Sequence, residues 1–349
     1  MLETTITKML NITHPVMLAG MARVTQADLV IAVSNAGGVG CLGGVSYLPD
    51  ALREEIRRIK AETTGPFAVN LLLPEALTSD DAEQWAPVQK IWNELRPEER
   101  VKMKGVESLL TPGAVRGQVE VVLDEAPDLV VLTFATPPEF IEQCHERGIK
   151  VAALVGSVGR AKAAEASGVD FVIAQGMEAG GHTGYVSTMV LIPQVLDAVS
   201  IPVAAGGGIA DARGLAAVLA LGAGAAWVGT RFIATPEAYG HDNFKQRVIE
   251  GQSKDTVLTR SYTGKPLRAF RNVWTAEWEG REQEVVGFPG QYAVSGTRVE
   301  LGYQDGDMDN GMMPAGQAIS LVHEMKPAAD IVREMSEGAE KILNGFSSK

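Results

Sequence analysis

The chain has 349 residues, 46% hydrophobic and 21% charged, which suits a globular protein with one large domain or two average ones. Its 43 acidic and 31 basic residues give a net charge of −12, which argues against nucleic acid or an anionic membrane as partner. The sequence predicts neither a signal peptide nor a transmembrane helix, and two cysteines, Cys41 and Cys144, are too few for a metal cluster. We therefore expect a cytoplasmic protein with reduced cysteines and no metal site.

Short apolar runs bounded by glycine, proline or aspartate recur along the first two thirds of the chain, with amphipathic or alanine-rich segments between them. Such uniformly apolar runs are typical of parallel strands covered by helices. We predict eight strands, at residues 16–18, 38–42, 67–72, 129–132, 151–155, 171–174, 203–205 and 226–228. Helices are predicted at residues 26–35, 52–61, 138–147, 160–167 and 212–221, with an extra helix at 81–95 in the long third connection.

Eight strand-then-helix repeats favour a (β/α)8 or TIM barrel. An open, doubly wound sheet is the alternative fold, but the sequence "LAGMARV" follows the first strand where that fold would place Gly-x-Gly-x-x-Gly. We predict a barrel over residues 1–235, a smaller, mainly helical insertion or lid domain over 236–300, and a C-terminal segment, 301–349, that returns to the barrel with a closing helix.

Small or isolated polar residues stand at or near the carboxyl ends of two predicted strands. In a barrel the active site lies at the carboxyl ends of the strands, so these residues are candidates for it. Gly20 and Met21 follow the first strand, where small residues would let a flat ligand approach the backbone. Asn70 stands among apolar neighbours in the third strand and must be hydrogen-bonded, either as a structural tie or as a ligand contact.

Glycine-rich turns follow the last two predicted strands. Three consecutive glycines, 206–208, precede Asp211 and a helix, and Gly229 and Thr230 open the next turn. Glycine lets backbone amides approach an anion closely, and the loops after strands seven and eight form the common phosphate site of barrel enzymes. Together the two turns predict a phosphate site that includes Gly207 and Gly208.

The loop "AQGMEAGGHTG", residues 174–184, follows the sixth strand. Gln175 ends that strand, so its amide should point into the mouth of the barrel. Four glycines surround His182, and we interpret them as room for a ligand that lies against the backbone. Because histidine titrates near neutrality, His182 is a candidate general base, although a solvated loop histidine is the ordinary alternative.

Three stretches, "FAVNLLLP", "AQGMEAGGHTG" and "IPVAAGGGIADARGLAAVLALGAGAAWVGTRF", resemble the nitronate monooxygenase family, formerly called 2-nitropropane dioxygenases. That family is similar to the flavin-dependent enoyl-acyl-carrier-protein reductase II and to a bacterial NADH:quinone reductase. The resemblance runs from residue 8 to residue 235 and resumes in "YTGKPLRAFRN" and "GDMDNGMMPAGQ". It implies a barrel that binds FMN non-covalently, with a small helical domain over the flavin ring.

The resemblance also implies roles for individual residues. His182 matches the family's catalytic base. The implied cofactor contacts are Gly20 and Met21 beside the flavin ring, Asn70 and Gln175 at its polar edge, Gly180 along the ring or ribityl chain, and Gly207, Gly208, Gly229 and Thr230 at the phosphate.

The activity that the resemblance implies is oxidation of nitronates or nitroalkanes by O2 to carbonyl compounds and nitrite. Two alternatives stay open: NAD(P)H-dependent reduction of enoyl thioesters or quinones on the same flavin, and a flavin-binding barrel without turnover. The quinone reductases carry a lysine after the fifth strand where this chain has Leu154, which argues against that branch. The natural substrate is not fixed, and a homodimer is left open.

Aromatic residues of the predicted insertion have two interpretations. Tyr262, Trp274 and Trp278 would either wall the substrate pocket or form the insertion's own small core. For the two tryptophans we favour the core.

Overall fold

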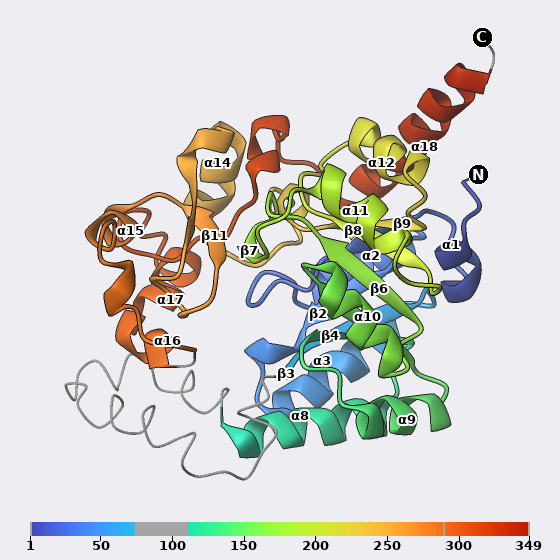
Figure 1. Cartoon of the computed structure of the whole chain (residues 1–349), viewed down its shortest axis with the longest axis horizontal. Coiled ribbons are helices and arrows are strands. Elements are labelled where there is room, and N and C mark those ends of the chain that lie inside the picture. The colour runs from blue at the N-terminus through green and yellow to red at the C-terminus, as the bar shows by residue number, and fades with distance from the viewer. Residues whose placement is uncertain (1, 74–110, 289, 348–349) are drawn as a thin grey trace.

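Eight short parallel strands form a barrel in the computed structural model, which describes residues 2–73, 111–288 and 290–347 (Figure 1). The strands are β1 (Val16–Leu18), β2 (Gly40–Gly43), β3 (Phe67–Leu73), β4 (Leu129–Phe134), β5 (Lys150–Val155), β6 (Phe171–Gln175), β8 (Val203–Gly206) and β9 (Ala225–Val228). Their spatial order is β1-β9-β8-β6-β5-β4-β3-β2, and a parallel bridge between Met17 and Val39 closes the ring. The predicted barrel is confirmed, and the open, doubly wound sheet is wrong.

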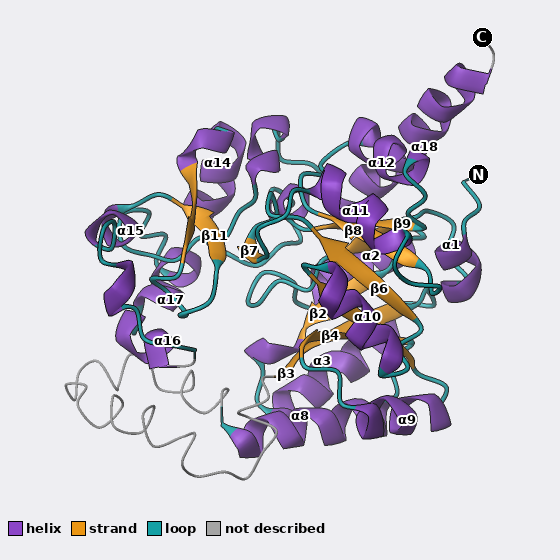
Figure 2. Cartoon of the chain, viewed as in Figure 1, coloured by secondary structure: helices purple, strands orange, loops and turns teal. Residues whose placement is uncertain are grey.

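The predicted helices on the outside of the barrel are also confirmed, with ends that differ by up to three residues. These helices are α2 (Ala27–Asn35), α3 (Pro49–Glu62), α9 (Pro138–Glu146), α10 (Val158–Ala166) and α12 (Ala212–Ala220). Two further helices, which were not predicted, are α8 (Pro112–Glu125) and α11 (Thr188–Leu196). Figure 2 shows these helices around the strands. In α3 the buried residues are Leu52, Ile56 and Ile59, whose spacing places them on one face of the helix. The predicted helix at 81–95 lies outside the described residues.

Alternation along the strands sorts the apolar side chains into two layers. In β6, Phe171 and Ile173 point into the barrel, while Val172 packs outward against the helices. The end of the barrel near the strand starts is closed by α1 (Thr5–Leu10), whose Ile6 joins the interior cluster. The interior is therefore a packed core, and a cavity lies above it at the carboxyl ends of the strands.

Both cysteines are buried and free. Cys41 lies in the barrel interior and Cys144 on α9, under the outer helices. Burial raises the pKa of the Cys144 thiol to about 12 and that of Cys41 further still, so both thiols are protonated at neutral pH.

The insertion contains helices and a small sheet. Its elements are α14 (Asp242–Glu250), β10 (Thr256–Thr259), β11 (Leu267–Phe270), α15 (Val273–Glu277), α16 (Gly290–Ser295) and α17 (Arg298–Gln304). Strand β11 pairs antiparallel with β10 and also with β7 (Gly181–His182), a two-residue strand that belongs to the loop after β6. Figure 1 shows most of the insertion on one side of the barrel with β7 at the boundary. The insertion thus reaches the histidine loop directly, a pairing that the sequence did not predict.

The chain returns to the barrel through α18 (Ala328–Ser347), which packs against α12 and α2. This is the predicted closing helix. No helix among the described residues is long and apolar enough to cross a membrane.

Candidate functional site

The floor of the candidate site is the last inward-facing layer of the barrel. Because alternate residues of a strand point inward, β6 continues from Phe171 and Ile173 to Gln175, and β3 continues from Ala68 to Asn70. The same alternation supplies the rest of this layer. The layer consists of Ala19, Asn70, Thr133, Leu154, Gln175 and Trp227. Thr133 and Trp227 were missed from the sequence, although strict alternation along β4 and β9 would have found them.

Above this floor lies a cavity of about 220 Å³. All ten residues predicted for the site line it. They are Gly20, Met21, Asn70, Gln175, Gly180, His182, Gly207, Gly208, Gly229 and Thr230. Aromatic side chains of the insertion and of the segment after it cover the cavity: Phe288, Tyr292 and Tyr303.

The two predicted phosphate loops lie side by side because β8 and β9 are neighbours. Gly207 and Gly208 have φ angles of +101° and +73°, a left-handed conformation that favours glycine. No backbone hydrogen bond among the described residues uses the amide N–H of Gly207, Gly208 or Gly229. Three backbone donors without a partner among the described residues, all beside one cavity, can bind an anion.

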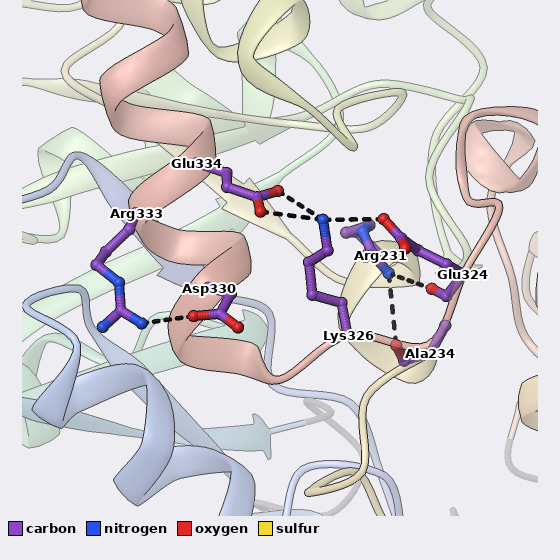
Figure 3. Close-up of polar contacts among 7 residues, drawn as sticks. All are labelled: Arg231, Ala234, Glu324, Lys326, Asp330, Arg333 and Glu334. Carbon is purple, nitrogen blue, oxygen red and sulfur yellow. Dashed lines mark hydrogen bonds and ion pairs between the residues drawn. The ribbon is translucent and has the colours of Figure 1, made fainter.

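Thr230 begins the short helix α13 (Thr230–Ile233), and its hydroxyl oxygen accepts a hydrogen bond of 2.9 Å from the amide of Gly316. Its hydroxyl proton is left for another acceptor. The next residue, Arg231, is buried but does not line the cavity. Its guanidinium donates to the carbonyls of Ala234 and Glu324 (Figure 3), so it ties α13 to the segment around Glu324 without contacting the cavity.

Lys326 connects this segment to α18. Its ammonium lies 2.9 Å from the carboxylate of Glu324 and 2.8 Å from that of Glu334, as Figure 3 shows. The carboxylates are largely exposed, so each pair contributes little stability by itself. Together the two pairs fix the segment that Arg231 contacts.

Asn70 and Gln175 both use amide protons within the protein. Asn70 Nδ2 donates to the carbonyl of Val131 at 2.8 Å and to the hydroxyl of Thr133 at 3.0 Å. Gln175 Nε2 donates to the carbonyl of His182 at 2.7 Å. Asn70 is therefore a structural tie that can still offer its oxygen to a ligand, and Gln175 keeps its oxygen and one N–H.

His182 lines the cavity and is held from three directions. Its backbone pairs with Leu267 of β11, its carbonyl accepts from Gln175, and its Nε2 lies 2.9 Å from the hydroxyl of Thr263. Burial, and to a smaller extent the positive charge of Lys265, lower the pKa of His182 to about 4. The imidazole is therefore neutral near pH 7 and can accept a proton.

An aromatic and cationic cluster surrounds that imidazole. Phe134 packs edge-on against the His182 ring, with centroids 5.5 Å apart, and against Phe288 at 5.8 Å. The Lys265 ammonium lies 3.8 Å from the centre of the Phe134 ring. Phe134 has a φ of +81°, a strained value for a bulky residue, which indicates that this packing fixes the end of β4.

Three of the four glycines around His182 have a different reason from the one predicted. A Cβ on Gly176 would lie 2.1 Å from the Thr188 hydroxyl, one on Gly180 would lie 2.7 Å from the Ala315 backbone, and one on Gly184 would lie 2.8 Å from the Gly156 carbonyl. Close packing against the protein itself therefore requires these three glycines. The fourth, Gly181, has a φ of +72° and open space around it.

An ion pair on the cavity wall was missed from the sequence. Arg23, which lines the cavity, donates to Glu300 of α17 with Nη2 and Oε1 2.6 Å apart, and also to the carbonyl of Ser46. Both side chains are mostly buried. The pair joins the loop after β1 to the insertion, and nothing in the local sequence of either residue indicates the other.

Tyr262, Trp274 and Trp278 do not line the cavity. The Trp274 ring lies 5.5 Å from Trp278 and 6.4 Å from Tyr262, and the Arg298 guanidinium covers Trp274 at 4.2 Å. These residues form the core of the insertion, which confirms the favoured interpretation for the tryptophans and extends it to Tyr262.

The chain is similar to known proteins over nearly its whole length. The family model described as nitronate monooxygenase matches residues 3–338. A Staphylococcus saprophyticus protein named "Probable nitronate monooxygenase" is 33% identical, over 98% of this chain and 99% of its own length. FabK from Thermotoga maritima is 32% identical with a TM-score of 0.82, covering 100% of this chain and 99% of that one. Nitroalkane oxidase from Streptomyces ansochromogenes is 27% identical with a TM-score of 0.82, covering 98% and 99%.

Proposed function

Because the chain belongs to the nitronate monooxygenase family, an enzyme family of flavin-dependent oxidoreductases, we propose that it oxidises nitronates and nitroalkanes with O2. The products would be a carbonyl compound and nitrite, and His182 would be the catalytic base. One observation carries the proposal: a single cavity joins the neutral imidazole of His182 to the unpaired amides of Gly207, Gly208 and Gly229.

The residues present fit FMN as the particular flavin. FMN ends in a phosphate, and the three unpaired amides with the Thr230 hydroxyl proton would bind its oxygens. Asn70 has used both amide protons, so its oxygen would accept from the ring N–H, whereas Gln175 could donate to a ring carbonyl. Bound FMN would supply the electron transfer between the organic substrate and O2.

The protein's own part is to bind the substrate and to move its proton. A neutral nitroalkane has an acidic C–H next to the nitro group, and the neutral imidazole of His182 can take that proton. If the substrate binds as the nitronate anion, the His182 side chain stabilises it by hydrogen bonding. The covering side chains Phe288, Tyr292 and Tyr303 would keep the pocket apolar and exclude water.

The proposal is tested first by the absorption spectrum of the purified protein and by nitrite release from ethylnitronate in air. We expect a flavin spectrum, release of FMN on denaturation, and stoichiometric nitrite. A folded protein that is colourless and does not take up FMN would refute both the cofactor and the activity.

A second candidate is NAD(P)H-dependent reduction of an enoyl thioester, which the similarity to FabK favours. Reduction of quinones has less support, because Leu154, at the position of the quinone reductases' lysine, lines the cavity as an apolar side chain. Anaerobic mixing with NADH or NADPH separates the candidates. Rapid bleaching of the flavin by the nicotinamide alone would favour the reductase, and bleaching only after addition of a nitronate would favour the monooxygenase.

A flavin-binding barrel without turnover is the third candidate. It predicts that neither the natural protein nor His182→Ala consumes a nitroalkane, although both bind FMN. The cytoplasmic location stays a prediction, and the oligomeric state stays open.

A further inference from the structure

Thr263 is a buried residue of the insertion that touches the imidazole of His182. It lies in the segment between β10 and β11, is 2% exposed and lines the cavity. Its hydroxyl oxygen is 2.9 Å from His182 Nε2 and 3.3 Å from the carbonyl oxygen of Lys265. The hydroxyl therefore stands between an imidazole nitrogen, which can donate or accept, and a carbonyl, which can only accept.

One placement of protons makes both contacts hydrogen bonds. A threonine hydroxyl has a single proton, and the Lys265 carbonyl can be bonded here only by receiving it. One lone pair of the Thr263 oxygen accepts from the Lys265 amide N–H at 3.4 Å and the other is left for His182, so Nε2 must carry the imidazole proton and donate it. The reverse placement, with the hydroxyl donating to Nε2, would leave two oxygens facing each other without a proton between them.

The other ring nitrogen is available to a ligand. His182 Nδ1 has no hydrogen bond with any described residue, and it is not among the buried polar atoms that lack a partner. It therefore keeps accessible surface in a residue that lines the cavity. With the proton on Nε2, Nδ1 holds the lone pair.

We propose that Thr263 is a positioning residue that holds the His182 proton on Nε2 and so presents Nδ1 as the base toward the substrate. This inference rests on the proposed function and specifies how the base is prepared. The substrate C–H bond breaks, its electron pair stays on the nitronate, and the proton forms a new Nδ1–H bond. The resulting imidazolium donates through Nε2 to Thr263 without any reorganisation.

The charged groups near this pair do not compete for the proton. Lys265 is a cation whose ammonium lies over Phe134, and Arg268 of β11 donates to the carbonyl of Met177. Glu178 has its carboxylate bonded to the amide and hydroxyl of Thr188. Thr263 is therefore the group that decides which nitrogen is protonated.

The direct test is the tautomer of His182, read from two-bond ¹H–¹⁵N correlations of the flavin-loaded protein labelled at histidine. The chain has five histidines, and the spectrum of His182→Asn identifies the signals of His182 by their loss. We expect the Nε2–H form in the natural protein and in Thr263→Ser, and a mixture of tautomers in Thr263→Val. An Nδ1–H form in the natural protein, or an unchanged tautomer in Thr263→Val, would overturn the inference.

Kinetics give an independent readout. Thr263→Val should lower kcat/KM for neutral nitroethane by about 10- to 100-fold and change it for preformed ethylnitronate by no more than about twofold. Thr263→Ser should restore nitroethane activity to within about threefold of the natural protein. The matched control is Thr259→Val, because Thr259 lies in the same insertion and bonds Ser261 rather than the histidine.

The two proposals fail in distinguishable ways. A natural protein that oxidises neither compound would refute the proposed function, while the tautomer would still decide the role of Thr263. A natural protein that oxidises both, together with a Thr263→Val variant that keeps its nitroethane rate, would refute the role of Thr263 alone.

Discussion

The variant Gly208→Ala tests the proposed phosphate site, because it should weaken FMN binding much more than it lowers the stability of the fold. Gly208 has a φ of +73°, and the nearest atom to an added Cβ would be Glu178 Cβ at 3.6 Å, so a methyl group fits among the protein atoms. The left-handed conformation costs an alanine about 1–2 kcal/mol, partly offset by about 0.4–1 kcal/mol from the less flexible unfolded chain. The free energy of unfolding should therefore fall by only about 1 kcal/mol.

The variant should lose more free energy of FMN binding than free energy of unfolding. The added methyl group would stand beside an amide that we propose donates to the phosphate. Loss of one hydrogen bond to a charged group costs about 1.5–3 kcal/mol, which corresponds to an increase of about 10- to 150-fold in Kd. The assay is titration of the flavin-free protein with FMN, followed by flavin fluorescence, with chemical denaturation for stability.

Gly148→Ala is the matched control. Gly148 has a φ of +74° and no neighbour within 4 Å of an added Cβ, and it lies between α9 and β5 at the opposite end of the barrel. Both variants should lose the same stability, and only Gly208→Ala should bind FMN weakly. An equal Kd in the two variants would show that the phosphate does not lie against Gly208.

Three further predictions concern His182 and the ion pair on the cavity wall. His182→Asn should lose about 10²–10⁴-fold in kcat/KM on neutral nitroethane and far less on ethylnitronate, and equal losses would show that the histidine is no proton acceptor. The pKa of His182 is about 4 in the folded protein and 6.5 in its ordinary state, so between these pH values the unfolded chain binds a proton at His182 that the folded protein does not. The flavin-free protein should therefore lose stability as the pH falls from 6.5 to 4. Denaturation curves of His182→Asn should lack that part of the slope, and an identical slope would contradict the lowered pKa. Glu300→Gln leaves the mostly buried Arg23 without its carboxylate partner and should lower the free energy of unfolding by about 2–4 kcal/mol. The control is Glu284→Gln in the exposed Arg281–Glu284 pair, which should lower it by less than about 0.5 kcal/mol. Similar losses in the two variants would contradict the argument from burial.

The glycine-rich loops and the histidine loop that line the cavity could be predicted because their signals are local. Consecutive glycines at 206–208, Gly229 with Thr230, and His182 after a buried strand each lie within a few residues of a predicted strand end. The barrel fold then brings all strand ends to one face, so loops far apart in sequence meet there. Strict alternation along β4 and β9 would have added Thr133 and Trp227 to the site.

The reason for the glycines around His182 could not be predicted. Gly176, Gly180 and Gly184 lie close to Thr188, Ala315 and Gly156, and the contact with Ala315 comes from a segment far along the chain. A glycine that makes room for a ligand and one that makes room for the protein look the same in a sequence. Only the packed structure distinguishes them.

The sequence by itself determined the eight-stranded barrel, the face on which the candidate site lies and the loop residues that line its cavity, because hydrophobic periodicity and turn chemistry act over a few residues. The tertiary structure alone decided which groups complete the site. Thr263 is 81 residues from His182, and Arg23 is 277 residues from Glu300. The pairing of β11 with β7 and the packing of α17 over the cavity bring these partners together, and no local pattern records contacts that depend on how distant segments dock.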